Sequence, residues 1–171
     1  LSASEQFDLY SGGGLDQTFL GLAEMDRFGN VNVSHFGGQI SGPGGFIDIS
    51  QGARNVVFCG SFDAKGARIS LADGGLKIER HGQITKVAGI TFSGSEAVKR
   101  GQTVHYITER AVFRLADDGV ELIEHAPGID VRADILDRMA FAPIVRNPIE
   151  MDRAHFAPAS LNDSGEISVP A

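Results

Sequence analysis

The chain has 171 residues, 42% of them apolar, which is enough material for one domain with a closed hydrophobic core. Its 22 acidic and 15 basic residues give a formal net charge of −7, which argues against a nucleic-acid partner because nucleic-acid binders concentrate Lys and Arg. One cysteine, Cys59, excludes an internal disulfide, and apolar runs such as 55–59 are far shorter than the ~20 residues that span a bilayer, so we expect a cytoplasmic protein with no membrane partner.

The N-terminal part of the chain is predicted to be extended pieces separated by turns over residues 6–34. The triplet 12–14 is all glycine and forms a flexible joint. Residues 18–23 are mostly apolar, which is typical of a strand buried on both faces. Residues 26–30 have turn composition and 31–34 alternate apolar with polar side chains, so the sequence predicts a hairpin here.

Glycine then becomes dense at positions 37–38 and 42–45. A short helix is predicted over residues 46–51, ended by Gly52. The β-branched and aromatic residues at 56–59 are typical of a central parallel strand.

From residue 67 onward the pattern becomes antiparallel. Residues 68–71 and 76–79 alternate around an Asp-Gly-Gly turn at 73–75, which predicts a hairpin. A short helix is expected over 93–101, with serine at its start and glycine past its end. A second alternating pair, 104–115 and 120–124, surrounds the turn at 117–119.

The last predicted helix begins after Asp130, whose carboxylate can cap it, and places Val131, Ile135 and Met139 on one stripe. The chain beyond Phe141 is expected to be irregular because prolines recur in it, at positions 143, 148, 158 and 170. The elements together predict a mixed α/β fold with more strand than helix.

The glycines at 42, 44 and 45 are the first candidate for a functional site. Backbone N–H groups without a neighbouring Cβ can approach a ligand and stabilise a developing oxyanion. The alternative is a turn that requires positive φ angles. The segment lacks the third glycine of a dinucleotide-binding fingerprint, and no Gly-Lys-Ser or Gly-Lys-Thr of a P-loop occurs in the chain.

Two charged residues follow predicted buried strands, where active residues of α/β sheets gather. Lys65 could pair with a phosphate or carboxylate, and the alternative is a solvated loop lysine. Glu24 is similarly placed. The five histidines show no i, i+4 spacing or acidic pair typical of metal ligation, so no metal site is predicted, and Cys59 fits an inert residue of an apolar strand.

The order of these motifs resembles the C-terminal half of family I coenzyme A transferases, of the acetate or propionate CoA-transferase and 3-oxoacid CoA-transferase types. The segments that carry the resemblance lie within residues 6–145: they are 7–16, 20–26, 29–34, 42–50, 56–62, 106–113 and 122–130. The resemblance implies an open mixed sheet of the NagB/RpiA/CoA-transferase type, an α/β fold with added antiparallel hairpins. Residues 1–145 would form the C-terminal portion of a CoA-transferase domain and 146–171 an irregular C-terminal tail.

The chemistry that the resemblance implies is nucleophilic catalysis by a glutamate, which forms a mixed anhydride and then a glutamyl-CoA thioester. The resemblance thus implies an enzyme that moves CoA between short-chain acids. Coenzyme A is then a substrate, no cofactor is bound permanently, and the other partners are acyl-CoA and small carboxylic acids. The family's oxyanion-hole glycine, which also lies against CoA, corresponds to Gly45, with Gly44 beside it. Its CoA-contacting lysine corresponds to Lys65.

One family feature is missing, because no Glu in this chain is followed by Asn as in the family's nucleophile segment. We therefore expect that the chain is the distal portion of a longer enzyme, that its partner is the missing N-terminal portion, that it assembles as a homo-oligomer, and that it is inactive alone. The alternative function is a non-catalytic partner subunit or binding module that retains the fold.

Overall fold

The computed structural model describes residues 2–36, 39–63, 65–83, 90–157, 160–161 and 167–168. The helices are α1 (Ala3–Ser11), α2 (Phe46–Gly52), α3 (Gly94–Lys99), the π-helix η1 (Val131–Ile135) and the 3-10 helices η2 (Leu136–Arg138) and η3 (Arg153–Phe156). The strands are β1 (Gln17–Gly21), β2 (Glu24–Met25), β3 (Val31–Asn32), β4 (His35–Phe36), β5 (Gln39–Ile40), β6 (Asn55–Cys59), β7 (Arg68–Ala72), β8 (Gly75–Arg80), β9 (Thr103–Ile107), β10 (Ala111–Ala116), β11 (Gly119–His125), β12 (Ile144–Glu150), β13 (Ser160–Leu161) and β14 (Ile167–Ser168).

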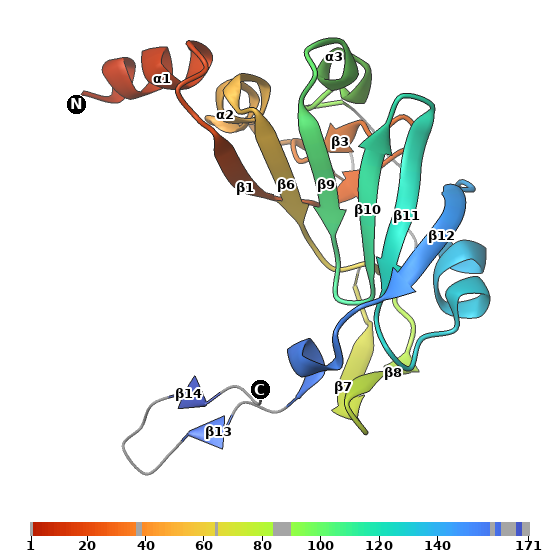
Figure 1. The fold of residues 1–171 in the computed structure, drawn as a ribbon. Coiled ribbons are helices and arrows are strands. Elements are labelled where there is room, and N and C mark those ends of the chain that lie inside the picture. The colour runs from red at the N-terminus through yellow and green to blue at the C-terminus, as the bar shows by residue number, and fades with distance from the viewer. Residues whose placement is uncertain are drawn as a thin grey trace.

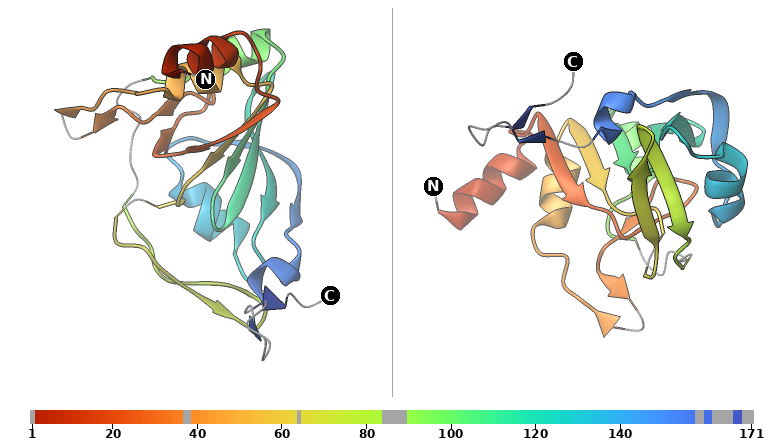
Figure 2. Two further views of the ribbon diagram at one scale, coloured as in Figure 1. Left: turned by 90° about the vertical axis from the view of Figure 1, so that its left-hand side faces the viewer. Right: turned by 90° about the horizontal axis from the view of Figure 1, so that it is seen from below.

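A six-stranded mixed sheet in the order β1-β6-β9-β10-β11-β12 organises the fold (Figure 1). The strands β1, β6 and β9 are parallel, β9, β10 and β11 are antiparallel, and β11 pairs in parallel with β12. The helices α1, α2 and α3 lie at the end of the sheet where the three parallel strands begin. The loops that follow these strands therefore leave from the opposite end. The β4–β5 hairpin and the β7–β8 hairpin project from the body (Figure 2). The mixed α/β sheet agrees with the predicted fold class.

Aromatic rings fill the centre of the core. Phe58, which is fully buried on β6, stacks on Phe46 and Tyr106 with ring centroids 5.7 and 5.6 Å away, and meets Phe92 edge-on at 5.0 Å. The buried Tyr106 hydroxyl donates to the Gly29 carbonyl at 2.7 Å. This bond ties the loop before β3 to the middle of the sheet.

Several predicted elements are confirmed. The helix α2 matches the predicted range, and β6 lies between two parallel neighbours, as expected for a central strand. The β7–β8 hairpin turns at Asp73 and Gly74, both with positive φ (53° and 68°). The Ser93 hydroxyl caps α3. The β10–β11 hairpin also forms as predicted.

The prediction of extended structure at the start of residues 6–34 is wrong, because helix α1 continues to Ser11. The sequence Ser2–Glu5 forms a capping box, in which the Ser2 N–H donates to Glu5 at 2.6 Å and the Glu5 N–H donates to the Ser2 hydroxyl at 3.3 Å. This Ser-x-x-Glu pattern is a recognised helix start.

The predictions for the strand at 18–23 also need correction. The strand ends at Gly21 and lies at the edge of the sheet, so Phe19 is 68% exposed instead of buried. It pairs in parallel with β6, and the local hairpin is formed by β2 and β3 instead. The predicted continuous strand 104–115 is divided into β9 and β10 by a turn at Thr108, whose side chain and N–H both bond to Ala111.

The C-terminal predictions are partly wrong. Asp130 does cap a helical segment through the Ala133 N–H at 2.8 Å, but the segment is a π-turn followed by a 3-10 turn. The first residues of the expected irregular tail form strand β12, which crosses the predicted boundary at 145/146. The pairing register of β12 shifts between Leu122 and Glu124 of β11, so Pro148 falls in a bulge on an edge strand, where a missing N–H is tolerated. The prolines at 158 and 170 lie outside the described residues.

Candidate functional site

The connections that follow the three parallel strands line one groove. The connection after β1 contributes Leu22 and Ala23, that after β6 contributes Gly60 and Ser61, and that after β9 contributes Glu109. Ligands of open α/β sheets bind beyond the carboxyl ends of parallel strands. The groove has a volume of about 770 Å³. Its lining residues are Leu22, Ala23, Gly60, Ser61, Phe62, Asp63, Lys65, Gly66, Ala67, Ile69 and Glu109.

Lys65 is the cation that the sequence analysis selected, and the structure places it in this groove. It is exposed, on the connection between β6 and β7. Its carbonyl accepts the Gln83 N–H at 3.2 Å, which joins this connection to the segment that follows β8. The Lys65 ammonium group is therefore carried by an anchored backbone.

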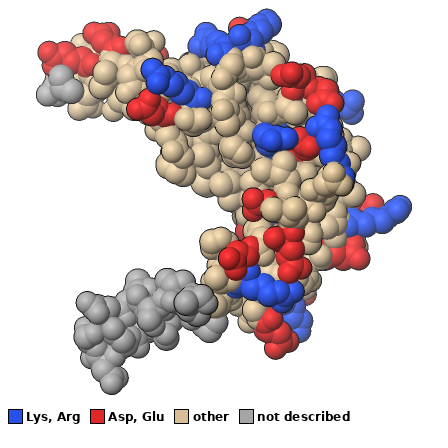
Figure 3. Space-filling view, in the orientation of Figure 1, with Lys and Arg blue, Asp and Glu red and all other residues tan. Residues whose placement is uncertain are grey.

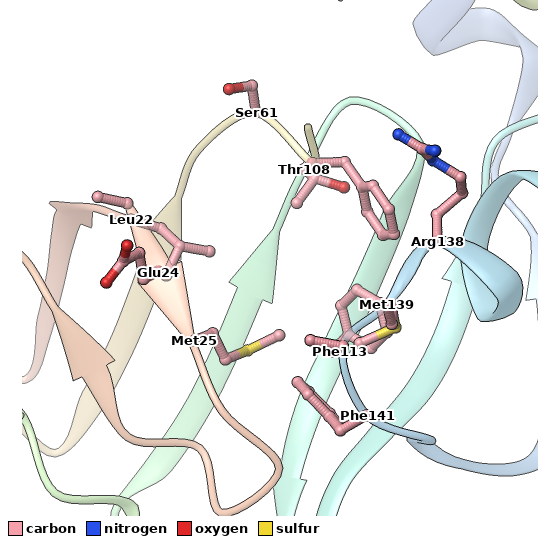
Figure 4. A pocket seen from close by; sticks show the side chains of 12 residues that line it. Leu22, Glu24, Met25, Ser61, Thr108, Phe113, Arg138, Met139 and Phe141 are labelled. Carbon is pink, nitrogen blue, oxygen red and sulfur yellow. The ribbon is translucent and has the colours of Figure 1, made fainter. Parts of the chain in front are cut away.

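A smaller recess of about 90 Å³ adjoins the groove and shares Leu22, Ala23, Ser61 and Phe62 with it. The complete lining of the recess is Leu22, Ala23, Glu24, Met25, Ser61, Phe62, Thr108, Phe113, Arg138, Met139, Ala140 and Phe141. Figure 4 shows Ser61 and Arg138 at one end and Met25, Met139 and Phe141 toward the other. The recess is thus polar where Ser61 lies and apolar at its far end.

A cluster of buried and half-buried ionisable side chains, which we call the charge network, lies behind the groove. Its members are Asp63, His81, Glu109, Arg110, Asp134 and Arg138. The Arg110 guanidinium is fully buried and lies 3.2 Å from the Asp63 carboxylate and 2.8 Å from that of Glu109. It also lies 4.7 Å from the centre of the Phe62 ring, a cation–π distance. Buried charges of this kind are tolerated only when they are paired and hydrogen-bonded.

The charge network holds the groove wall in place. Glu109 accepts the Phe62 N–H at 2.8 Å with one carboxylate oxygen and the Arg110 Nε–H with the other. Asp63 accepts the Gly82 N–H at 3.0 Å, and Arg138 donates to the Gly82 carbonyl at 2.7 Å. These bonds fix the chain on both sides of Lys65.

The pKa of Asp63 lies below its usual value. Burial alone would raise this pKa, but the Gly82 N–H bond and the positive charges of Arg110 and Arg138 favour the carboxylate and outweigh burial. Asp63 is therefore ionised at neutral pH and serves as the anionic centre of the charge network.

The structure does not bring Gly44 and Gly45 into the groove. Gly44 has a φ of +55°, so the turn interpretation of this glycine is confirmed, whereas Gly45 has a φ of −81° and stands at the start of α2. A Cβ on Gly45 would lie 2.9 Å from the Phe7 ring of α1. The predicted oxyanion glycine thus faces α1 among the described residues.

Of the other candidates, Glu24 lines the recess and accepts a 2.6 Å hydrogen bond from the buried Asn32 amide. Cys59 is exposed at the end of β6. His81 lies 3.5 Å from Asp63 and 3.4 Å from Asp134, a placement that sequence spacing did not suggest. Within the described ranges no group of three potential ligands is placed to hold a metal ion, and none of their helices is long and apolar enough to cross a bilayer.

Arg110 and its partners were not among the residues predicted from the sequence. The signal available was a Glu-Arg pair between two apolar strands, where a charge must find a buried partner. The surface charges, by contrast, are interspersed in sign on the face shown in Figure 3.

The chain is similar in sequence to curated CoA-transferases. It is 47% identical over 166 residues to the acetate CoA-transferase YdiF of Escherichia coli O157:H7, covering 94% of this chain and 31% of that protein. It is 46% identical over 161 residues to the caffeate CoA-transferase of Acetobacterium woodii, covering 88% of this chain and 30% of that protein. The chain thus spans about a third of the length of the curated relatives it matches. No family model matches it.

Comparison with solved structures also finds CoA-transferases. The acyl-CoA transferase YdiF of Escherichia coli O157:H7, crystallised as a thioester complex with CoA, superimposes with a TM-score of 0.88 at 48% identity, covering 92% of this chain and 32% of that chain. The glutaconate coenzyme A-transferase of Acidaminococcus fermentans superimposes with a TM-score of 0.60 at 16% identity, covering 88% of this chain and 58% of that chain, which shows a shared fold. The chain is therefore similar to about one third of the YdiF chain in both sequence and structure.

Proposed function

We propose, from its homology to the acetate and caffeate CoA-transferases, that this chain forms the CoA-binding portion of an acyl-CoA:carboxylate CoA-transferase. The observation that carries the proposal is the match at 48% identity, over 92% of the chain, to an acyl-CoA transferase crystallised as a CoA thioester complex. The groove at the ends of the parallel strands supports it, because this is where such sheets bind ligands.

In the proposed reaction a glutamate carboxylate outside these 171 residues attacks the acyl-CoA carbonyl, and CoA thiolate leaves as a mixed anhydride forms. The thiolate then attacks the glutamyl carbonyl, which releases the donor acid and leaves a glutamyl-CoA thioester. An acceptor carboxylate completes the exchange through the reverse steps. Each step passes through a tetrahedral oxyanion, so fixed N–H donors accelerate it.

We assign Lys65 to the binding of CoA. Lys65 lines the groove, and its ammonium group can pair with a phosphate of the nucleotide part. Because Lys65 is exposed, the pair is worth about 1 kcal/mol in water, which corresponds to about fivefold in affinity.

Calorimetric titration of the chain with CoA tests this assignment. Lys65→Ala should weaken binding about fivefold at low salt, and the difference should shrink as added salt screens the charge. Lys77→Ala is the matched control, since Lys77 is an exposed lysine on β8 that does not line the groove. Equal affinities for the two variants would contradict the assignment of Lys65, and absence of CoA binding by the unaltered chain would contradict the proposed function.

We also propose that the amides of Gly44 and Gly45 stabilise the oxyanion and that Gly45 lies against CoA in the complete enzyme. Gly45→Ala alone is an ambiguous test because its Cβ would meet the Phe7 ring. The same substitution in a Phe7→Ala background removes that contact. In a complete enzyme that contains this region, a loss of ~10²–10³-fold in kcat in both backgrounds supports the role, and an unchanged kcat in the Phe7→Ala background refutes it.

The finer assignments are proposals as well. We propose that the whole enzyme is a cytoplasmic homo-oligomer, a state supported by the exposed apolar side chains of Phe19 on edge strand β1 and Ile40 on β5. The Phe19→Asp variant of the complete enzyme should then elute at a smaller size in gel filtration, with native circular dichroism. An unchanged elution volume would show that Phe19 does not lie in the interface between subunits.

A further inference from the structure

Another pocket lies at the end of the sheet opposite the groove. The turn between β10 and β11 forms one side of it, and β10 runs antiparallel to β9, so this turn lies where the parallel strands begin (Figure 1). The pocket has a volume of about 260 Å³, and none of its lining residues lines the groove or the recess. The side chains that line it are those of Arg27, Phe28, Asp118, Val120, Ala142 and Ile144.

Hydrogen bonds hold the turn between β2 and β3, which carries two of these side chains, in one conformation. The Asp26 carboxylate accepts the Phe28 N–H at 2.9 Å and the Asn30 N–H at 3.0 Å, and it also accepts the Asn30 side-chain amide at 2.8 Å. The Arg27 carbonyl accepts the Val120 N–H at 3.2 Å, which joins this turn to the start of β11. A ligand that binds the turn therefore does not have to order its backbone first.

The two side chains that this turn presents are both available to a ligand. Phe28 is 62% exposed, although it lies on a backbone that is fixed in place. Arg27 is exposed as well, and it forms no ion pair with any residue that the structure describes. An aromatic ring and an unpaired guanidinium thus stand next to each other at the edge of the pocket.

The pocket is positively charged at one side and apolar at the other. Asp118 lines it as well, but its carboxylate lies 2.9 Å from the Arg146 guanidinium and is paired there. Arg27 therefore supplies the charge that an incoming ligand can neutralise. The other lining side chains are aliphatic: they are Val120, Ala142 and Ile144.

We propose that this pocket binds a small organic acid, with its carboxylate on Arg27 and its apolar body against Phe28 and the aliphatic side chains. A guanidinium offers two parallel N–H donors that match the two oxygens of a carboxylate. The volume exceeds the ~150 Å³ of an engineered cavity that holds benzene, so a phenyl ring fits. The site is separate from the groove, and the proposal does not rest on the proposed function.

Phenylacetate is a suitable probe, because it joins a carboxylate to a phenyl ring through one methylene group. In the ¹⁵N-labelled chain it should shift the backbone amide signals of Phe28, Gly119 and Ala142, and the shifts should saturate. The alcohol 2-phenylethanol lacks the charge and should bind about fivefold more weakly, since an exposed ion pair in water contributes about that factor. Acetate lacks the ring and should bind about tenfold more weakly, because about half of a phenyl ring would be buried in an open pocket.

Substitutions separate the two contacts. Arg27→Gln should weaken phenylacetate about fivefold and leave the affinity for 2-phenylethanol unchanged. Phe28→Ser should weaken both compounds by a similar factor. Arg68→Gln is the matched control for Arg27, because Arg68 is an exposed arginine on β7 that does not line the pocket. All three positions are exposed, so native circular dichroism is expected for each variant.

Three results would overturn the proposal. Without saturable shifts at these three amides, the pocket is not a binding site. Equal affinity of phenylacetate for Arg27→Gln and for the unaltered chain would show that the guanidinium does not hold the carboxylate. Inorganic phosphate that shifts the same amides with the affinity of phenylacetate would make the pocket a site for simple anions.

Titration of the same sample with CoA tests the proposed function independently. CoA should shift the amide signals of Gly60 and Gly66, which line the groove, and should leave those of Phe28 and Ala142 in place. If CoA does not bind while phenylacetate does, the proposed function fails and the site at Arg27 stands. Displacement of phenylacetate from these amides by CoA would show that the pocket is part of the CoA site and would overturn its separate assignment.

Discussion

Replacing Arg110 with methionine should destabilise the chain more than the same replacement at any exposed arginine. The side chain is fully buried and carries a charge that is paired with Asp63 at 3.2 Å and Glu109 at 2.8 Å. Methionine is similar in length to arginine but carries no charge. The Asp63 carboxylate would therefore stay buried with less positive charge beside it. Removing one partner of a buried ion pair costs about 3–5 kcal/mol, because the other charge stays buried.

The lower end of that range is expected here, since Arg138 remains 3.5 Å from Asp63 and the Gly82 N–H still donates to it. A loss of about 3 kcal/mol is a large part of the ~5–15 kcal/mol that stabilises a domain. With a urea m-value of about 2 kcal/mol/M, the unfolding midpoint should fall by about 1.5 M.

The loss of stability caused by Arg110→Met should be smaller at low pH than at neutral pH. In the unaltered chain the pKa of Asp63 lies below its ordinary value, so its contribution to stability is present above about pH 3.9 and is lost as the pH falls through the folded-state pKa. Without Arg110 this pKa rises, and protonation relieves the buried charge at a higher pH. The difference between variant and unaltered chain should therefore narrow in acid.

Urea unfolding followed by circular dichroism at pH 7 and at pH 4 measures both effects. Arg54→Met is the matched control, because Arg54 pairs with Asp16 at 3.2 Å while both side chains are largely exposed. Exposed pairs of this kind are worth ~0–1 kcal/mol. A midpoint for Arg110→Met equal to that of Arg54→Met, or a difference that does not change with pH, would refute the reasoning.

Three further predictions concern other parts of the fold. Tyr106→Phe removes the donor of the 2.7 Å bond to the Gly29 carbonyl and should cost about 1 kcal/mol in urea unfolding; no loss would mean that water replaces the hydroxyl. Gly60→Ala would press a Cβ against a backbone carbonyl of the connection after β1. It should lower the free energy of unfolding by about 1–3 kcal/mol and weaken CoA binding. A variant with unchanged stability and CoA affinity would show that the backbone of this connection moves to accommodate the methyl group. Burial and a nearby arginine hold the pKa of His105 below its usual value, so protonation favours the unfolded chain and stability should fall as the pH drops below about 6.5. That fall should be smaller in His105→Gln, and an equal fall would exclude this histidine as its cause.

Local chemistry explains which elements could be predicted from the sequence. The turn at Asp73 and Gly74 needs positive φ angles, and Ser93 supplies the cap of α3, so both elements follow from neighbouring residues. Strand β1 is different, because its apolar sequence does not reveal that, among the described strands, β6 is its one neighbour in the sheet. Strand β12 forms because β11 offers it an edge, and a bulge accommodates Pro148.

Some residues of the candidate site could likewise be predicted from the sequence, and others could not. Lys65 could be selected because it follows a strand whose apolar composition marks it as central. The partners of Asp63 could not be predicted, since Arg110 is 47 residues away along the chain and Arg138 is further still. Only the sheet order, which brings the connections after β6 and β9 together, makes them neighbours.

The charge network explains how the groove keeps its shape without regular secondary structure. The connection after β6 leaves the ladder of the sheet, and single backbone bonds such as that from the Gln83 N–H to the Lys65 carbonyl, at 3.2 Å, hold its described residues. Apolar burial is non-directional and would leave such a connection free to slide. The bonds from Phe62 to Glu109 and from Gly82 to Asp63 are directional, and Arg110 joins the two carboxylates that accept them. One buried guanidinium therefore fixes the position of the backbone that carries Lys65, which explains why a charge is placed where apolar packing would suffice for stability alone.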